Sequence, residues 1–230
     1  MSELSVLRAF CQEGGIPLDE EREAAFVAFR EALYRTNSVM NLTRVPFEGC
    51  ELRHFVDSLL IASLIPRGAR VVDVGTGPGF PAWPLARARP DLTITAVDSS
   101  NKMLGFLRRH PLPNLEVVLA RAEDWGVRDA FDVGTGRALA PLQIQLELIA
   151  PLVVVGGAVI PFRTVAEEEA ISSFPGHMLG LTLESVVRRA LPGEEIVRLF
   201  PVFRKVSSTP PKYPRTWAQI RARPLGTMPA

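Results

Sequence analysis

Residues 71–81 read VVDVGTGPGFP, and this stretch decides the fold of the chain. A short apolar run containing Asp73 gives way to alternating glycines at Gly75, Gly77 and Gly79. A strand that ends in a glycine turn and continues into a helix is how an α/β sheet brings backbone N–H groups to a ligand. Glycine supplies the positive φ angles of such a turn and has no Cβ to obstruct the ligand. The stretch therefore predicts a ligand-binding turn after the first strand of a parallel sheet.

The glycine spacing and two nearby acids indicate the kind of ligand. A dinucleotide fingerprint reads G-x-G-x-x-G and seats a pyrophosphate, whereas these glycines fall as G-x-G-x-G just after Asp73. A carboxylate at that place repels a pyrophosphate but suits an ammonium group. A second acid, Asp98, ends the predicted strand 93–98, where a carboxylate can accept both hydroxyls of a ribose. The pattern predicts S-adenosylmethionine (SAM) as cofactor; the alternative is a tight turn that binds no ligand.

Composition and cysteine use indicate the cellular setting. The chain has 230 residues, of which 47% are hydrophobic, and a net charge of +1, which fits one α/β domain with an appendage. Cys11 and Cys50 lie far apart, without Cys-x-x-Cys spacing or a histidine cluster, so we expect neither a disulfide nor a metal site. With no signal-like start and no long apolar run, we expect a cytoplasmic monomer that does not bind membranes.

Three zones follow one another along the chain. Residues 1–66 have the 3.6-residue periodicity of helices and are expected to pack on the core as an N-terminal extension. Residues 67–206 alternate strand and helix patterns, which predicts a mostly parallel sheet with helices on both faces and a closing antiparallel hairpin. Residues 207–230 are rich in proline and basic residues and are expected to form a tail of the same globular unit. The predicted strands are 70–74, 93–98, 115–119, 131–135, 152–160, 181–190 and 195–206.

The charge of the C-terminal zone is one-sided. Residues 196–230 contain seven lysines and arginines and no acid, which is typical of a surface that binds a phosphate backbone. Tyr213 and Trp217 lie in the same zone and are able to stack on bases. The alternative is a basic C-terminus that is merely solvated.

Seven short motifs occur in the order found in a known family. They are Asn41–Thr43, Arg53–Leu59, residues 72–86, Asp98–Lys102, Arg121–Glu123, Gly136–Ala138 and Lys212–Arg215. Over about residues 37–225 the chain resembles the bacterial small-subunit ribosomal RNA guanine-N7 methyltransferases, historically called glucose-inhibited division protein B. The resemblance implies a Rossmann-like enzyme that uses SAM to methylate a guanine N7 in the 530 loop of 16S rRNA. Its partner is then 16S rRNA or a small-subunit assembly particle.

The resemblance also implies roles for individual residues. Ala122 and Glu123 match the adenine-binding pair, and Arg137 matches an arginine near the methionine end and the reaction site. The expected cofactor-binding residues are Asp73, Gly75, Gly77, Gly79, Phe80, Asp98, Ser99, Ala122, Glu123 and Arg137. The expected catalytic residues are Arg137, Asn41 and Arg163. The chain departs from the family at Ala82 and Trp83, at Gly136, and at Arg163, where the family often has a lysine.

The RNA-binding residues that we expect are Arg53, His54, Arg204, Lys205, Lys212 and Arg215. For His54 and Asp57 we favour a polar cluster that braces the mouth of the site over a catalytic dyad. For Asn41 the alternative to a role in the site is that it forms the C-cap of a helix.

The chemistry fits an N7 target, because guanine N7 carries a lone pair and no proton, so that its methylation needs alignment and no general base. A methyltransferase that acts on a pyrimidine carbon needs a cysteine nucleophile near its site. Cys11 and Cys50 both precede the glycine turn, and no cysteine follows it. A SAM-dependent methyltransferase that acts on a small molecule or on another RNA site remains the alternative.

Overall fold

The structure, a computed structural model, describes residues 4–226 and contains a mixed sheet within them. The order of its strands is β3-β2-β1-β4-β5-β8-β6, and β7 pairs with β8. β1 to β5 are parallel, and β7 and β8 form the antiparallel hairpin that was predicted. The antiparallel pairing of β8 with β5 and β6 was not predicted. The strands are β1 (Arg70–Val74), β2 (Thr93–Asp98), β3 (Leu115–Leu119), β4 (Phe131–Thr135), β5 (Val153–Val159), β6 (Arg163–Thr164), β7 (Leu181–Ala190) and β8 (Val197–Lys205).

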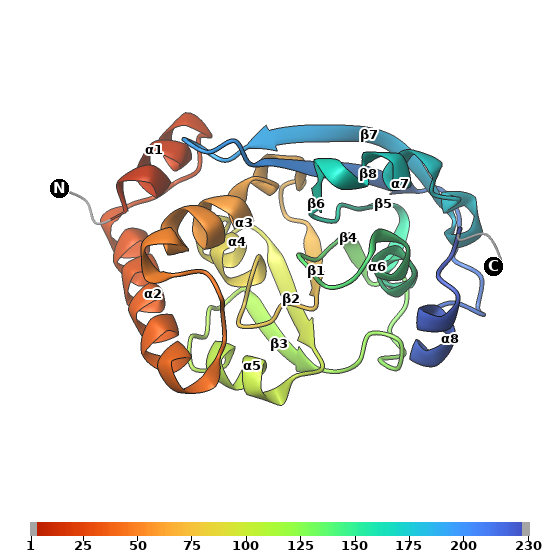
Figure 1. The fold of residues 1–230 in the computed structure, drawn as a ribbon, viewed down its shortest axis with the longest axis horizontal. Coiled ribbons are helices and arrows are strands. Elements are labelled where there is room, and N and C mark those ends of the chain that lie inside the picture. Colours follow the sequence, from red (N-terminus) through yellow and green to blue (C-terminus); the bar gives the residue numbers. More distant parts are fainter. Residues whose placement is uncertain (1–3, 227–230) are drawn as a thin grey trace.

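Helices cover both faces of this sheet (Figure 1). They are α1 (Ser5–Glu13), α2 (Glu20–Met40), α3 (Asp57–Leu59), α4 (Ala82–Ala88), α5 (Asn101–Leu107), α6 (Leu142–Ile149), α7 (Glu168–Ser173) and α8 (Trp217–Ala222). The α1 to α4 helices lie on one side of the central strands, and α6 and α8 lie on the other. Within residues 4–226, no helix combines the length and apolar character needed to cross a membrane.

Two hydrophobic cores result from the alternation of side chains along each strand. In β1, Val71 packs into a core shared with α1, α2 and α4, whereas Val72 and Val74 pack into a core shared with α6 and β8. In β2, Ile94 joins the first core and Val97 the second. The near-continuous apolar strands of the sequence are therefore strands buried on both faces.

The N-terminal helices are joined to the sheet through an aromatic cluster. Phe29 of α2 stacks on Trp83 of α4, with ring centroids 4.0 Å apart, and also meets the edge of Phe80. Phe26 packs against both Phe55 and Trp83. Trp83, one of the departures from the family pattern, thus fills the space between α2 and α4.

The predicted N-terminal extension, 1–66, and the predicted tail, 207–230, reach beyond the described residues. Residues 1–3 of the first and 227–230 of the second lie outside them.

The segment 51–65 is helical, as predicted, but it is irregular. A π-helical turn at Glu51–Val56 leads into the short α3, and a 3-10 turn follows at Ala62–Leu64. The carbonyl of Arg53 accepts a hydrogen bond from Arg137, and that of His54 accepts one from the Ser58 hydroxyl. Side chains thus supply hydrogen bonds to carbonyls of this segment, and widened turns of this kind are frequent at functional sites.

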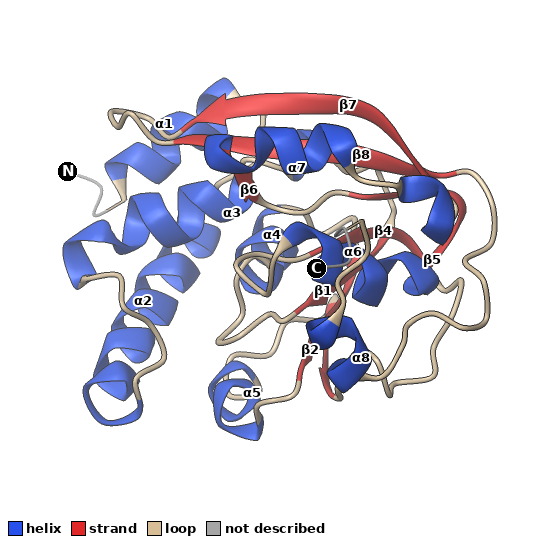
Figure 2. Ribbon diagram, turned by 45° about the vertical axis from the view of Figure 1, so that its right-hand side comes forward, coloured by secondary structure: helices blue, strands red, loops and turns tan. Residues whose placement is uncertain are grey.

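The hairpin of β7 and β8 crosses the top of the molecule, and the chain after it returns to the carboxyl ends of the central strands (Figures 1 and 2). Of its two strands, β8 contacts β5 at Ala158 and Val159 and β6 at Arg163 and Thr164. The described part of the predicted tail, residues 207–226, lies against the body of the molecule. It contains α8, which packs beside α6 through Ile220, Ile144 and Leu148.

Candidate functional site

The glycine turn follows β1 at the centre of the sheet, next to the point where the strand order reverses between β1 and β4. Ligands of open α/β sheets bind outside the carboxyl ends of strands at such a point. Gly75, Gly77 and Gly79 have φ angles of 75°, 58° and 116°, which only glycine adopts without strain. A Cβ at Gly77 would stand in open space, whereas one at Gly75 would collide with the side chain of Leu139. The turn thus presents bare backbone at Gly77.

Asp98, at the end of β2, is fixed by the glycine turn. Its Oδ2 accepts a hydrogen bond from the N–H of Gly77 at 2.8 Å, and its Oδ1 accepts one from the N–H of Ser100 at 2.8 Å. The N–H of Gly75 meanwhile donates to the carbonyl of Val97 at 2.8 Å. The ends of β1 and β2 are therefore held together, and the carboxylate of Asp98 has a defined orientation before any ligand binds.

A cavity of about 220 Å³ opens beside Asp98 at the carboxyl ends of β1, β2 and β3. Glu123, whose side chain is only 5% exposed, lies in its wall and accepts a hydrogen bond from Nε of Arg121 at 2.7 Å. The polar and loop residues lining the cavity are Gly75, Asp98, Ser99, Arg121, Ala122, Glu123, Leu139 and Trp217. Five residues predicted to bind the cofactor therefore share one cavity: Gly75, Asp98, Ser99, Ala122 and Glu123.

Asp73 lies beneath the turn and is fully buried. Its Oδ2 accepts a hydrogen bond from the N–H of Ala82, the first residue of α4, at 3.2 Å. Burial raises the pKa of Asp73 to about 7, although the Ala82 N–H and the cation of Arg137 oppose the rise. Asp73 does not line the cavity, so its contact with α4 is the role that the structure displays.

Phe80, at the end of the turn, is covered by two side chains from elsewhere in the chain. His54 stacks on its ring with centroids 4.1 Å apart and planes 6° apart. The guanidinium of Arg137 lies over the same ring, 5.3 Å from its centroid. The predicted residues His54, Phe80 and Arg137 thus form one cluster at the end of the turn.

The hydrogen bonds of His54 determine its tautomer. Nη2 of Arg137 lies 3.1 Å from Nδ1 of His54, and Nε2 of His54 lies 2.7 Å from Oγ1 of Thr43. Because a guanidinium has only donors, Nδ1 accepts and Nε2 carries the proton, which it donates to Thr43. Burial and the cation of Arg137 lower the pKa of His54 to about 3. His54 is therefore a neutral bracing residue, in line with the polar cluster favoured from the sequence.

Asp57 closes the cluster from below. It is 1% exposed and accepts from Nη1 of Arg137 at 3.0 Å and from Nε and Nη2 of Arg198 at 2.8 Å and 3.1 Å. Burial lowers the pKa of Arg137, while Asp57 opposes that shift. Asp57 and Arg137 both belong to motifs of the sequence, whereas no local pattern indicates that Arg198 of β8 joins them.

The other two predicted catalytic residues lie apart from the cavity. Asn41 is the C-cap of α2, in the left-handed conformation with φ 46°, which is the alternative that the sequence left open. Arg163 is 4% exposed, and its Nη1 donates to the carbonyl of Ala140 at 2.9 Å and to Glu167 at 3.0 Å. Its Nε and Nη2 have no hydrogen-bond partner within the described chain. Arg163 therefore holds the loop that carries Leu139.

The predicted RNA-binding residues separate by their surroundings. Lys205 is 1% exposed, and its Nζ donates to the carbonyls of Ala150 and Val153. Burial lowers the pKa of Lys205 to about 8. Its ammonium satisfies carbonyls inside the fold and is not displayed to a phosphate, so Lys205 is removed from the RNA-contacting set.

Three of the other predicted cations already have acidic partners. Arg215 forms two hydrogen bonds through its side chain to the buried Glu147. The exposed Arg53 pairs with Glu194, and the half-buried Arg204 pairs with Glu184. Lys212 is exposed and lies over the ring of Tyr213, 5.2 Å from its centroid. Of this set, Lys212 is the cation that the fold leaves most accessible to a phosphate.

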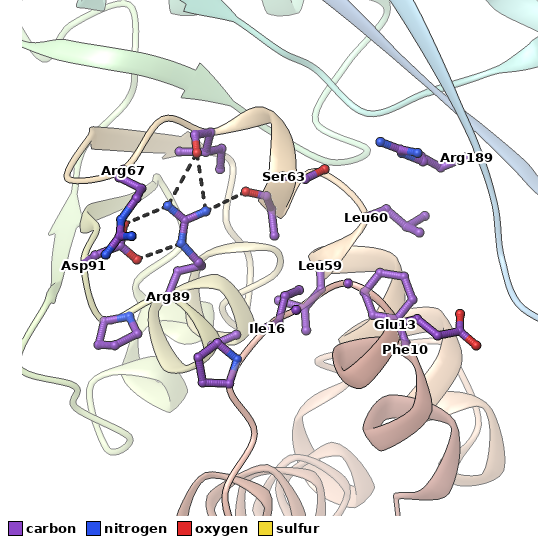
Figure 3. A pocket seen from close by; sticks show the side chains of 17 residues that line it. Phe10, Glu13, Ile16, Leu59, Leu60, Ser63, Arg67, Arg89, Asp91 and Arg189 are labelled. Carbon is purple, nitrogen blue, oxygen red and sulfur yellow. Dashed lines mark hydrogen bonds and ion pairs between the residues drawn. The ribbon is translucent and has the colours of Figure 1, made fainter.

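A larger cavity, of about 730 Å³, lies at the opposite edge of the sheet (Figure 3). Arg67 and Asp91, which precede β1 and β2, mark its position at the amino ends of the strands, and Phe10 and Ile16 form part of its wall. In Figure 3, Arg89 is joined to Asp91 on one side of this cavity. None of the predicted site residues lines it, so its size alone does not make it the candidate site.

Comparisons with known proteins agree on a family. A family model described as rRNA small subunit methyltransferase G matches residues 22–191. A protein of Acetivibrio thermocellus named Ribosomal RNA small subunit methyltransferase G is 36% identical over 222 residues, which cover 92% of each chain. A protein of the same name from Lysinibacillus sphaericus is 36% identical over 228 residues, covering 94% of this chain and 95% of the relative.

Two solved structures share the fold at low identity. M. jannaschii TYW2 in complex with AdoMet has a TM-score of 0.55 at 17% identity, covering 66% of this chain and 75% of its own. A SAM-dependent methyltransferase from Aquifex aeolicus has a TM-score of 0.54 at 16% identity, covering 67% and 92%. These likenesses establish the methyltransferase-type α/β fold that the glycine turn predicted.

Proposed function

This chain belongs to the rRNA small subunit methyltransferase G family, and we propose that it transfers a methyl group from SAM to N7 of a guanine in small-subunit rRNA. It is accordingly a SAM-dependent methyltransferase. We place the target guanine in the 530 loop of 16S rRNA, as the family resemblance implies. The observation that carries the proposal is the convergence of Gly75, Asp98 and Glu123 on one cavity at the carboxyl ends of β1, β2 and β3.

The residues around the cavity fit the cofactor. The bare backbone of Gly77 leaves room where any side chain would protrude. The carboxylate of Asp98 is already oriented by two N–H groups and retains acceptor capacity for ribose hydroxyls. Glu123 offers a nearly enclosed carboxylate for an amino group of the base. When bound, SAM supplies a sulfonium methyl group that a lone pair can attack.

The protein supplies alignment to this reaction. Guanine N7 has no proton to lose, so that the neutral His54, locked between Thr43 and Arg137, is not required as a base. We assign Arg137 to positioning: its bonds to Asp57 and His54 and its place over Phe80 fix the end of the glycine turn. Holding the two reactants in line is the contribution by which such a site gains rate.

The substrate side of the site is assigned from charge. Lys212 is exposed close to the cavity wall formed by Tyr213 and Pro214, and it is the leading candidate for a phosphate contact. We keep Arg53, which is exposed, and Arg204, which is half-buried, as candidates, although each has an acidic partner. The proposed partner is 16S rRNA, either free or within a small-subunit particle.

A methyl-transfer assay tests the function. The protein is incubated with labelled SAM and, in parallel, naked 16S rRNA, small ribosomal subunits, large-subunit rRNA and a mixture of metabolites. We expect label in small-subunit rRNA, and we expect none in large-subunit rRNA or in the metabolites. Asp98→Ala should lose most of the transfer, because it removes the oriented acceptor for the ribose. Label confined to small metabolites would overturn the RNA assignment in favour of a small-molecule methyltransferase.

A further inference from the structure

The segment from Pro210 to Ile220 folds back onto the cofactor cavity. Arg215 is bound to Glu147 of α6 through its backbone N–H at 3.0 Å and through its guanidinium at 2.8 Å and 2.6 Å. Glu147 is fully buried, and Ile220 is buried between Ile144 and Leu148. A buried ion pair and an apolar contact therefore hold α8 in place, close to the ends of the strands.

Trp217, the first residue of α8, forms part of the cavity wall. Trp217 lines the same cavity as Asp98 and Glu123, and like Ala122 and Leu139 it packs against the cluster of Ile144, Leu148 and Ile220. The guanidinium of Arg121 lies 5.7 Å from the centre of the indole and donates to Glu123. Trp217 is half-buried, so part of its ring is not covered by the protein.

A second cavity lies next to the cofactor cavity and shares part of its wall. This cavity, of about 210 Å³, shares Ala122, Glu123 and Leu148 with the first and is lined on its far side by Tyr213 and Pro214. The C-terminal segment therefore borders Glu123 from both directions, with Trp217 in one cavity and Tyr213 in the other. Ala122 and Glu123, which line both cavities with it, are the residues that the family resemblance assigns to the adenine end of the cofactor.

We propose that Trp217 is a cofactor-binding residue, which stacks on the adenine ring of SAM, and that the segment Pro210–Ile220 forms the outer wall of the cofactor site. An indole and a purine both present flat π faces, and their stacking adds to the apolar area that is buried. Glu123 lies next to the indole and can accept from the amino group of the same ring. This inference rests on the proposed function, since it takes SAM as the ligand of the cavity.

The test measures ligand affinity in variants of the full chain. S-adenosylhomocysteine (SAH) and 5′-methylthioadenosine, which keeps the adenosine half but lacks the amino-acid end, are titrated calorimetrically. In Trp217→Leu the side chain can still pack on the cluster of Ile144, Leu148 and Ile220 but has no aromatic face. We expect both ligands to bind roughly three- to tenfold more weakly to it, which corresponds to about 0.7–1.4 kcal/mol.

Two further variants separate stacking from structural support. Trp217→Phe restores an aromatic face and should bind both ligands within about twofold of the wild type. Arg221→Ala changes an exposed side chain on the same helix and should leave both affinities unchanged. Equal losses in the Leu and Phe variants would mean that Trp217 supports the fold alone, and the inference would be overturned.

The remaining outcomes are also decisive. If the wild type binds SAH and Trp217→Leu binds both ligands as tightly, the inference fails while the proposed function stands. If Trp217→Leu weakens RNA binding and leaves both ligand affinities intact, Trp217 stacks on an RNA base and the inference is again refuted. If the wild type does not bind SAH, the cofactor assignment itself fails, and the inference fails with it.

Discussion

Arg137 and Asp57, which are 80 residues apart in the chain, form a buried ion pair in which Nη1 of Arg137 lies 3.0 Å from Oδ2 of Asp57. The pair joins the end of β4 to the irregular helical segment before β1. Arg198 of β8 binds the same carboxylate, so that three distant parts of the chain meet at Asp57. The glycine turn rests on this meeting point through Phe80 and Arg137.

Asp57→Ala should therefore destabilise the protein strongly. It leaves Arg137 buried without its counter-charge, and breaking a buried pair in this way costs roughly 3–5 kcal/mol of the free energy of unfolding. Urea unfolding at neutral pH measures the change. Glu184→Ala is the matched control, because it breaks the exposed pair with Arg204 and should cost less than about 1 kcal/mol. Similar small losses in both variants would contradict the bracing role of Asp57.

Asp73 should make stability depend on pH. Its pKa is raised from 3.8 to about 7 by burial, so the folded state retains this proton more strongly than the unfolded chain does. The contribution of Asp73 to stability is therefore present at acidic pH and is lost as pH rises through about 7. Asp73→Asn, which carries no such charge, should gain stability relative to the wild type between about pH 5 and pH 8. Urea titrations at both pH values measure this difference, and a constant or reversed difference would refute it.

Lys205 and Lys212 should respond to substitution in different ways. Lys205→Ala removes a buried ammonium that donates to the carbonyls of Ala150 and Val153, and it is expected to lower the free energy of unfolding by roughly 1–3 kcal/mol. Lys212→Ala should leave stability nearly unchanged. If Lys212 contacts a phosphate, its loss should reduce the slope of log RNA affinity against log salt by roughly one. An unchanged slope would remove Lys212 from the RNA interface.

The part of the fold that could be predicted is the part encoded locally. Strands 70–74, 93–98, 115–119, 131–135 and 181–190 have the predicted bounds, because each is a run of apolar or alternating residues between turn signals. The glycine turn and the acid at the end of β2 were likewise readable, since a ligand-binding turn needs those residue types at those positions.

The remainder depends on contacts between distant residues. Arg198 lies 141 residues from Asp57, and Arg215 lies 68 residues from Glu147, so no local pattern indicates either pair. The basic C-terminal zone suggested that Lys205 and Arg215 contact RNA, yet both turn inward because the fold offers them carbonyls and a buried carboxylate. Charge composition predicts neither burial nor pairing, which are decided by tertiary packing.

The identity of the methylated atom tests the central claim most directly. Small-subunit rRNA treated with the protein and SAM is digested to nucleosides and analysed by mass spectrometry against an untreated sample. We predict 7-methylguanosine as the new product and its disappearance when SAM is omitted. A new methyl group on another base, on another guanine atom or on a ribose would contradict it, as would rRNA that remains unmodified while the protein binds SAM.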